Sequence, residues 1–339
     1  MKAMVYTKAG GLDVLQLREV ERPVPRDDHV LVKVKAAALN IIDYERFKTL
    51  SDKVALFPRL INIVQGSVGH PLGGEISGIV VEVGKNITHV KEGDEVFGKT
   101  TGMFPKGGWA EYALTGEAHI ERKPANFSFE EAAVIPVAFE TALGSVRAGK
   151  VSAGQQVMVY GSSGGVGQMA VQLSKAAGAT VTGVCSTRNI EMAHSIGCDY
   201  VVDYKREDFR DSGRTYDVII GINGNNPLKE YKKLLKKDGV FVGIGGGSQV
   251  IAALLLSPFS KHYTTYNAPT MPQKDYLSYA KSLAESNMLN PFIDRIYPVQ
   301  EAAEAIRYVV TEHAQGKVAL SVDFKHIPVC HPSGEAGGV

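Results

Sequence analysis

The pattern of hydrophobic and polar residues changes about a third of the way along the chain. Before Pro124, short segments such as 30–36 and 76–83 alternate apolar and polar residues, as strands with one buried face do. From residue 157 onward, short apolar runs alternate with segments that place apolar residues at helical spacing. Strands that alternate with helices are typical of a parallel sheet covered by helices on both faces. The pattern therefore predicts a β-rich part followed by a doubly wound α/β domain.

The boundaries of these parts follow from turn residues. We expect strands at 157–160, 180–185, 200–203, 217–221, 239–244 and 263–268, with helices at 168–177 and 228–237. Pro269 and Pro272 then mark a boundary, and a helix at 300–312 and a strand at 317–323 return to the first domain. The predicted division is 1–124, 125–268 and 269–339, with a mobile Gly- and Pro-containing end at 330–339.

A glycine-rich turn at 161–167 carries the strongest functional signal. It lies between the apolar run 157–160 and the predicted helix, and it reads Gly-x-x-Gly-x-x-Gly, with Ser162 where Gly-x-Gly-x-x-Gly would have its first glycine. A tight turn and the close approach of a pyrophosphate both need residues without a Cβ, and the helix N-terminus offers N–H groups to the phosphates. In this strand–turn–helix setting the motif predicts a dinucleotide site, and the alternative is a plain βα turn.

The end of the strand 180–185 indicates which dinucleotide. NAD-binding proteins usually carry an Asp or Glu about 20 residues beyond the glycines, where it holds the ribose 2′-OH. This chain has Ser186, Thr187, Arg188 and Asn189 there instead. Hydroxyls and a guanidinium suit a 2′-phosphate, which favours NADP(H) over NAD(H). The alternative is that Arg188 is a solvated residue in the first turn of the next helix.

Composition and charge narrow the class of protein. A length of 339 residues favours two domains, and 44% hydrophobic with 22% charged residues is ordinary for a soluble enzyme. The formal net charge of +1 gives no reason to expect nucleic acid, and no apolar run is long enough to span a bilayer. The chain opens on a strand-like alternation, without the pattern of a secretory signal, and its three cysteines are far apart. We therefore expect a cytoplasmic protein with reduced thiols.

Several motifs in order resemble the medium-chain dehydrogenase/reductase superfamily along nearly the whole chain. Besides the glycine turn they are Ala-Leu-Asn-Ile-Ile-Asp at 38–43, Pro-Leu-Gly-Gly-Glu-Ile-Ser-Gly at 71–78, Gly-Asp-Glu-Val-Phe-Gly at 93–98, Gly-Trp-Ala-Glu-Tyr at 108–112, Thr-Ala at 141–142 and Gly-Lys-Val at 316–318. The resemblance implies an α/β protein. A GroES-like β-rich catalytic domain is built from both ends of the chain, and a Rossmann domain is inserted. The active site is expected in the cleft between them.

The resemblance also bears on metal binding. At the positions where zinc-dependent members hold their catalytic zinc, this chain has Asn40, Gly74 and Val137, and Gly and Val cannot bind zinc. No cysteine lies between Phe97 and Trp109, where a structural zinc lobe would fall. The chain therefore resembles the zinc-independent quinone oxidoreductase branch, and no metal site is predicted. The dispersed His70, His89 and His119 are interpreted as surface or packing residues, and Glu75 is expected to pair with a base such as Arg295 or to be structural.

A metal-free site limits the reaction. Without a Lewis acid, alcohol oxidation is hard, but a conjugated carbonyl still accepts a hydride. The resemblance therefore implies NADPH-dependent reduction of small-molecule quinones or α,β-unsaturated carbonyls. Two alternatives stay open. One is a zinc-free reductase of simple aldehydes or ketones, and the other is an NADPH-binding structural or RNA-associated, crystallin-like protein without turnover.

The resemblance places site residues on this sequence. Asn40 would line the cleft, Thr141 would meet the nicotinamide, and Tyr44 stands one residue before a position that carries Tyr in many relatives, so that it is either a catalytic donor or a packing residue. The expected cofactor contacts are Ser162, Ser163, Gly164, Gly165, Val166, Gly167, Ser186, Arg188, Tyr204, Asn223, Ile244, Gly245 and Lys317. The alternating, uncharged strand at 263–268 would join two copies edge to edge in a homodimer.

Overall fold

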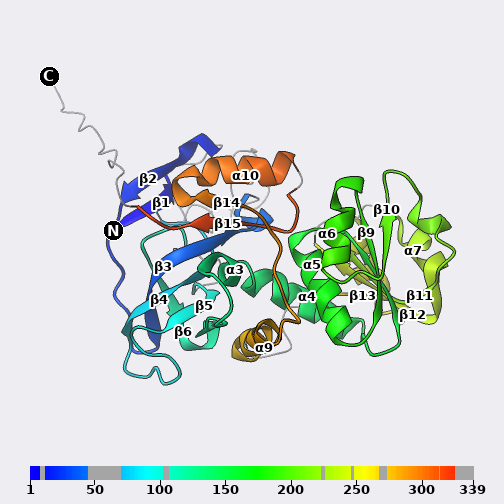
Figure 1. Ribbon diagram of the computed structural model, residues 1–339, viewed down its shortest axis with the longest axis horizontal. Helices are drawn as coiled ribbons and strands as arrows, with labels where there is room; N and C mark the ends of the chain where they lie inside the picture. Colours follow the sequence, from blue (N-terminus) through cyan, green and yellow to red (C-terminus); the bar gives the residue numbers. More distant parts are fainter. Residues whose placement is uncertain are drawn as a thin grey trace.

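The protein folds into two lobes that lie side by side along its longest axis (Figure 1). This computed structural model describes residues 1–7, 12–44, 70–101, 107–222, 226–245, 248–266, 273–312 and 314–324. One lobe, coloured green to yellow in Figure 1, is a sheet covered by helices on its two faces. The other lobe is β-rich and combines the blue and cyan first part of the chain with its orange and red last part.

The helix-covered lobe is a Rossmann domain. Its described residues form a six-stranded sheet in the order β10-β9-β8-β11-β12-β13, in which all neighbours run parallel. The strands are β8 (Gln156–Tyr160), β9 (Thr180–Cys185), β10 (Tyr200–Asp203), β11 (Tyr216–Ile222), β12 (Leu235–Ile244) and β13 (Tyr263–Thr265). Chain order reverses between β8 and β11, and in such sheets the crevice beyond the carboxyl ends of these strands is where ligands bind.

Helices pack on this sheet and connect it to the other lobe. They are α3 (Phe129–Ala133), α4 (Pro136–Ala148), α5 (Gly165–Ala176), α6 (Ile190–Ser195), α7 (Leu228–Leu234), α8 (Ser248–Leu256) and α9 (Gln273–Glu285). A capping box between Ser128 and Glu131 starts α3, and Pro136 stands in the first turn of α4, where its missing N–H costs nothing. Residues 128–148 thus carry the chain from the β-rich lobe to the Rossmann domain.

The β-rich lobe is built from both ends of the chain, as the resemblance implied. β14 (Ile293–Pro298) and β15 (Lys317–Ser321) join β3 (His29–Leu39), with β15 antiparallel to β3. The same sheet continues through β4 (Glu75–Val83), β5 (Glu95–Lys99) and β7 (Ile120–Arg122), while β6 (Tyr112–Gly116) also pairs with β3. A separate pair, β1 (Lys2–Tyr6) and β2 (Leu15–Glu19), and the helix α10 (Ala302–Thr311) lie against this lobe (Figure 1).

Most predicted elements are confirmed, and a few boundaries were wrong. The strands at 180–185 and 200–203 are found at those residues. The helix expected at 228–237 ends at Leu234, because Leu235 pairs with Tyr216 of β11 and Lys236 forms an ion pair with Asp217 at 2.7 Å. Sheet pairing therefore overrides the helical preference of the lysines here. β15 ends at Ser321 rather than 323, and a 3₁₀ turn at 299–301 precedes α10.

Other predictions about the chain's organisation lie partly outside the described residues. The strand expected at 263–268 is described only as far as Thr265, and residues 267–268, Pro269, Pro272 and the segment 330–339 lie outside. The boundaries at 124/125 and 268/269 stay predictions. In the described part of the chain, no helix is both long and apolar enough to cross a membrane.

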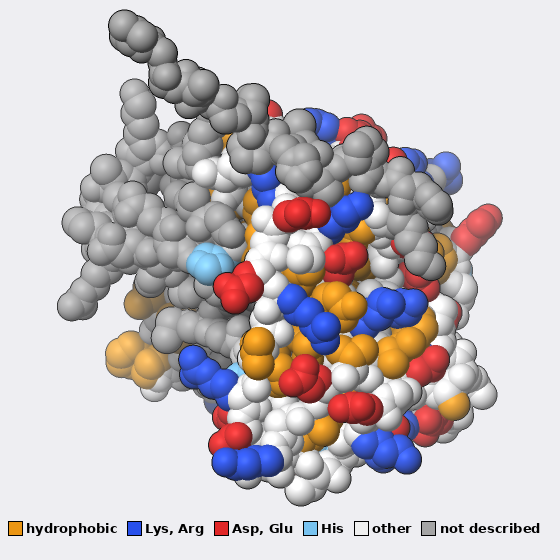
Figure 2. Space-filling view, turned by 90° about the vertical axis from the view of Figure 1, so that its left-hand side faces the viewer, with side chains coloured by type: hydrophobic (Ala, Val, Ile, Leu, Met, Phe, Trp, Pro, Cys, Tyr) orange, Lys and Arg blue, Asp and Glu red, His pale blue; other side chains and the backbone are white. Residues whose placement is uncertain are grey.

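Figure 2 looks onto the β-rich lobe from its outer end. On the side chains drawn there, Lys and Arg are interspersed with Asp and Glu, and hydrophobic residues lie between them. Mixed charges of this kind do not make the single-sign patch that attracts a phosphate backbone. This face therefore gives no support to nucleic-acid binding.

Candidate active site

A cavity of about 690 Å³ opens between the two lobes, at the carboxyl ends of β8, β9 and β11. Its lining comes from both lobes: the glycine turn and the ends of the Rossmann strands on one side, and the ends of β3 and β15 on the other. The predicted residues that line it are Asn40, Ser163, Gly164, Gly165, Val166, Ser186, Tyr204 and Lys317. The structure thus brings together residues that are far apart in sequence around one space.

The glycine turn has the geometry that a pyrophosphate needs. Gly161 takes a φ of +85°, and Gly164 precedes the first residue of α5 in extended conformation without a side-chain cap. The first N–H groups of α5 are therefore available at the cavity. A Cβ on Gly167 would lie 2.0 Å from the Gly161 carbonyl oxygen, so Gly167 allows the close turn without lining the cavity. Ser162 is also buried beneath the turn and donates to the Val184 carbonyl at 3.3 Å.

Asn189 is a buried residue that links the two serines of the cavity wall. Its Nδ2 donates to Ser163 Oγ at 2.7 Å and to Ser186 Oγ at 3.2 Å. Its Oδ1 accepts from Gln315 Nε2 of the other lobe at 2.5 Å. Sequence reasoning did not assign Asn189 to the site, although its place directly after Arg188 was a local signal. Gln315 stands in no motif, so nothing in the sequence pointed to it.

Three further predicted cofactor residues, Arg188, Ile244 and Gly245, are not among the residues that line the cavity. Arg188 is held by the β-rich lobe, with Nη2 donating to the Glu312 carbonyl at 2.6 Å. Ile244 is buried at the end of β12, and Gly245 follows it with a φ of +82°. Asn223 lies outside the described residues. The roles of these residues stay predictions.

On the side of the cavity that the β-rich lobe lines, Asn40, Glu75 and Lys317 form a polar group. Lys317 Nζ donates to Asn40 Oδ1 at 2.7 Å and to Glu75 Oε2 at 3.2 Å, and Asn40 Nδ2 donates to Glu75 Oε2 at 2.5 Å. The second Glu75 oxygen accepts from the Val137 N–H at 2.5 Å. Glu75 is 0% and Lys317 5% exposed, so the pair is removed from water and must satisfy its own charges.

The expected partner of Glu75 was wrong. Arg295 lies with its guanidinium 4.0 Å from the centre of the Tyr308 ring, while Glu75 pairs with Lys317. Register explains the difference. Val318 lies opposite Leu39 where β15 pairs with β3, which brings Lys317 to the end of β3 next to Asn40. Because Glu75 and Lys317 lie far apart in the sequence, no local pattern predicts their contact.

The same three residues decide whether zinc fits. An amide oxygen and a carboxylate could serve as ligands, but the Lys317 ammonium already lies between them, and a second cation would be repelled. The other aligned positions, Gly74 and Val137, have no ligand atoms in their side chains. Among the described residues, no three His, Cys, Asp or Glu side chains are grouped to hold a metal ion. These residues do not fit a zinc site.

Tyr44 and Thr141 are not among the residues that line the cavity. Tyr44 is half-buried and packs against the core of the β-rich lobe. Thr141 lies in α4 and its Oγ1 donates to the Val137 carbonyl one turn earlier at 2.8 Å. Their catalytic roles stay predictions. Cys185 does line the cavity, but burial raises the pKa of its thiol to about 11, which keeps it protonated and weakly nucleophilic at neutral pH.

Comparison with known proteins agrees with this architecture. Residues 26–125 match the family model "Alcohol dehydrogenase GroES-like domain", and residues 196–320 match "Zinc-binding dehydrogenase". The chain is 32% identical to the NADPH-dependent alkenal/one oxidoreductase of Arabidopsis thaliana over 334 residues, which cover 94% of this chain and 79% of that protein. It is 29% identical to the human quinone oxidoreductase, covering 94% and 97% of the two chains.

A solved structure shows the same fold. The quinone oxidoreductase from Coxiella burnetii superimposes with a TM-score of 0.82 at 29% identity, covering 95% of this chain and 99% of that one. The two-lobed fold, with its cavity beside a glycine turn, defines a nicotinamide-dependent oxidoreductase architecture. The chain belongs to the medium-chain dehydrogenase/reductase superfamily, in its quinone oxidoreductase branch.

Proposed function

We propose that this protein reduces quinones or α,β-unsaturated carbonyls with NADPH. The observation that carries the proposal is a single cavity lined both by the glycine turn of α5 and by Asn40 and Lys317 of the Asn40–Glu75–Lys317 group. The names of the relatives, an alkenal/one oxidoreductase and a quinone oxidoreductase, support the same substrate class.

The residues of the cavity fit a dinucleotide phosphate. Gly164 leaves open space at the start of α5 for the pyrophosphate, and the Lys317 stem crosses the neighbouring Gly165. Ser186 and Tyr204 lie in the wall at the ends of β9 and β10, and none of the described residues that line the cavity is acidic. Such a wall accepts a 2′-phosphate without charge repulsion. When bound, NADPH supplies the hydride for the reaction.

Asn40 is the hydrogen-bond donor that we assign to the substrate oxygen. Lys317 holds its Oδ1 and Glu75 holds one Nδ2 hydrogen, so the orientation of the amide is fixed. An amide carries two hydrogens, and no described residue accepts the second one. Because Asn40 lines the cavity, that hydrogen can bind a carbonyl oxygen as it gains negative charge.

Apolar side chains beside Asn40 favour a conjugated substrate. Ile41, Val137 and Ala138 line the cavity next to the amide. A flat, apolar acceptor can bury its ring or double bond against them while its oxygen faces Asn40. The nearby Lys317 ammonium stabilises negative charge at that end, and no step needs a metal.

The test is NADPH consumption with different acceptors. We expect turnover with 1,4-benzoquinone, 9,10-phenanthrenequinone and short 2-alkenals, and at least about a hundredfold lower kcat/KM with the matched saturated aldehydes. Conjugation spreads the negative charge that forms on hydride transfer, whereas a saturated aldehyde places it on one oxygen that no Lewis acid stabilises. Equal rates with saturated aldehydes would point to the simple-carbonyl reductase. NADPH binding without turnover on any acceptor would point to the structural role.

We propose further that the protein is a homodimer joined through the β13 edge of the Rossmann sheet. In the described residues β13 pairs only with β12, so its other edge can pair with a second copy. The adjoining helix α8 and the turn after it carry exposed hydrophobic side chains: Ile251, Leu254, Leu255 and Phe259 are 62%, 57%, 67% and 86% exposed. A second copy placed across the edge would cover this surface.

Light scattering tests the dimer directly. We expect the mass of two chains at micromolar concentration, and the mass of one chain for Leu255→Glu, because a charge buried in the interface costs several kcal/mol. Lys237→Glu, an exposed charge reversal on the same domain, is the control and should stay dimeric. A wild-type monomer would overturn the dimer proposal, and the proposed reductase function would still stand.

A further inference from the structure

Two glutamines in α5 hold the segment through which the chain leaves the Rossmann domain. Gln168 and Gln172 stand one helical turn apart and are 0% and 6% exposed. Gln168 accepts from the Phe292 N–H at 2.6 Å and donates to the Phe292 carbonyl at 3.0 Å. Gln172 does the same with Asn290, at 2.6 and 3.1 Å. Each amide thus pairs with one backbone residue as a neighbouring strand would.

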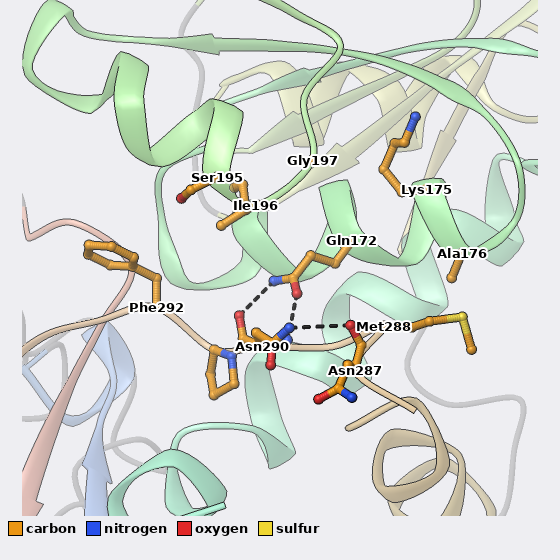
Figure 3. A pocket seen from close by; sticks show the side chains of 11 residues that line it. Gln172, Lys175, Ala176, Ser195, Ile196, Gly197, Asn287, Met288, Asn290 and Phe292 are labelled. Carbon is orange, nitrogen blue, oxygen red and sulfur yellow. Dashed lines mark hydrogen bonds between the residues drawn. The ribbon is translucent and has the colours of Figure 1, made fainter. Parts of the chain in front are cut away.

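This pairing fixes a segment that regular structure does not hold. Residues 286–292 join α9 to β14, and Asn287 adopts a φ of +58° there. Beside the segment lies a second cavity of about 420 Å³, bounded also by Lys175 and Met288 (Figure 3). Figure 3 shows the Gln172 amide facing Asn290, and Lys175 forms an ion pair with Asp199 at 2.8 Å. Residues 286–289 bond to the end of α9, whereas the two amides hold Asn290 and Phe292 against α5.

Of the two glutamines, Gln168 is the one whose backbone partner also bonds to β15 in the described part of the chain. The Phe292 carbonyl, its partner, also accepts from the Lys317 N–H at 3.1 Å. The neighbouring Gly316 N–H donates to the Ser163 carbonyl in the glycine turn at 2.7 Å. Gly316 fits closely here, since a Cβ on it would lie 2.3 Å from the Phe292 oxygen and 2.9 Å from Gln168 Nε2. Gln168, Phe292 and Lys317 therefore form one continuous hydrogen-bonded path.

We propose that Gln168 is a positioning residue for the cofactor site: by fixing Phe292, it places Gly316 and Lys317 against the glycine turn. The Lys317 stem then crosses Gly165, and its ammonium reaches Asn40 and Glu75. Gln172 makes an equivalent pair of bonds one turn farther from the cavity, and its partner Asn290 has no bond to β15 among the described residues. The inference rests on the proposed NADPH-dependent function.

The two glutamines provide a matched comparison. Gln168→Met removes two amide bonds and Gln172→Met removes three, because Gln172 Nε2 also donates to the Gln168 carbonyl at 3.3 Å. Gln172→Met should therefore lower the urea midpoint at least as much as Gln168→Met. In titration calorimetry with NADPH, we expect the Kd of Gln168→Met to rise roughly tenfold and that of Gln172→Met by less than about twofold, the scale of one or two neutral hydrogen bonds. At saturating NADPH the kcat of Gln172→Met should stay near the wild-type value, because its partner Asn290 has no bond to β15 among the described residues. Equal changes in Kd would overturn the inference.

A measurement on the wild-type protein covers the case in which Gln168→Met does not fold. Adding NADPH should slow hydrogen exchange at the Phe292 and Lys317 amides, and it should leave Asn290 little changed. Unchanged exchange at Phe292 and Lys317 in the presence of bound NADPH would overturn the role of Gln168 alone. A wild-type protein that binds no NADPH in the calorimeter would instead overturn the proposed function.

Discussion

The Lys317 ammonium lies 3.2 Å from the Glu75 carboxylate, and both side chains are buried where the two lobes meet. Removing one charge of such a pair leaves the other uncompensated. We expect Lys317→Met to lower the free energy of unfolding by about 3–5 kcal/mol, and adding Glu75→Gln to restore most of that loss. Urea denaturation of the single and double variants measures this. A double variant as unstable as Lys317→Met would contradict the pairing.

Asn40→Ala tests the hydrogen bond to the substrate oxygen. We expect kcat to fall roughly a hundredfold with benzoquinone, the size of one lost oxyanion donor, while the Kd for NADPH changes little. Asn126→Ala is the control, because it removes an amide bond to the Ala284 carbonyl away from the cavity. Unchanged kinetics of Asn40→Ala with several quinones would remove Asn40 from the site.

The side chain at position 186, in the wall of the cavity, should determine whether the protein prefers NADPH or NADH. A carboxylate there would repel a 2′-phosphate and could bind a ribose hydroxyl. We expect Ser186→Asp to reduce the ratio of kcat/KM for NADPH to that for NADH by roughly a hundredfold, since like charges in contact cost several kcal/mol. Ser186→Ala, which removes the hydroxyl without adding charge, should change the ratio far less. If the wild-type protein prefers NADH, the assignment of this wall to a phosphate is wrong.

Gly167→Ala should change stability through two opposing effects, a gain in helix propensity and a loss in packing. In a helix interior, alanine is favoured over glycine by about 0.8–1.0 kcal/mol. The added Cβ would, however, lie 2.0 Å from the Gly161 carbonyl oxygen, which is backbone and cannot rotate away. We expect packing to win, with a net loss of about 1–3 kcal/mol in urea denaturation. Gly164→Ala is the control for stability, since its Cβ would meet only the Gly161 oxygen at 3.6 Å.

Glu117 should make the fold sensitive to acid. Hydrogen bonds from His89 and from Thr88 lower the pKa of its carboxyl from 4.5 to about 2. Above pH 4.5 the carboxylate is ionised in both the folded and the unfolded chain, and its contribution to stability is complete. As the pH falls from 4.5 toward 2, the unfolded chain binds the proton first, and the contribution is lost.

Glu117→Gln isolates that effect. The variant cannot titrate at this position, so its urea midpoint should fall less between pH 5 and pH 3 than that of the wild-type protein, although it starts lower at pH 7. Parallel curves for the two proteins over this range would show that Glu117 has an ordinary pKa in the folded state.

Local patterns were sufficient to predict the fold and one end of the site. The glycine turn, the strand at 180–185 and Ser186 follow one another in the chain, so short-range signals place them together. The helix predicted at 228–237 ends earlier because a contact between distant residues overrides the local pattern. Its lysines favour a helix, but pairing of Leu235 with Tyr216, which a local window does not contain, starts the strand early.

The other end of the site could not be predicted in full because it depends on register between distant strands. Asn40 and Lys317 were identified through the resemblance, yet their contact arises only when β15 pairs with β3. The same holds for Asn189 and Gln315, whose bond joins the two lobes. Side chains without a motif that meet across more than a hundred residues leave no periodic signal in the sequence.

The position of β15 has a consequence for synthesis of the protein on the ribosome. The Rossmann strands end with β13 at Thr265, whereas Gly316 and Lys317, which close the cavity, belong to the last described strand. Since domains fold as they emerge, the glycine turn can form in a nascent chain that still lacks its lysine. The lining of the cavity is therefore complete only once β15 has emerged, well after the last described Rossmann strand, so a ribosome-bound chain can hold a formed glycine turn beside an unfinished site.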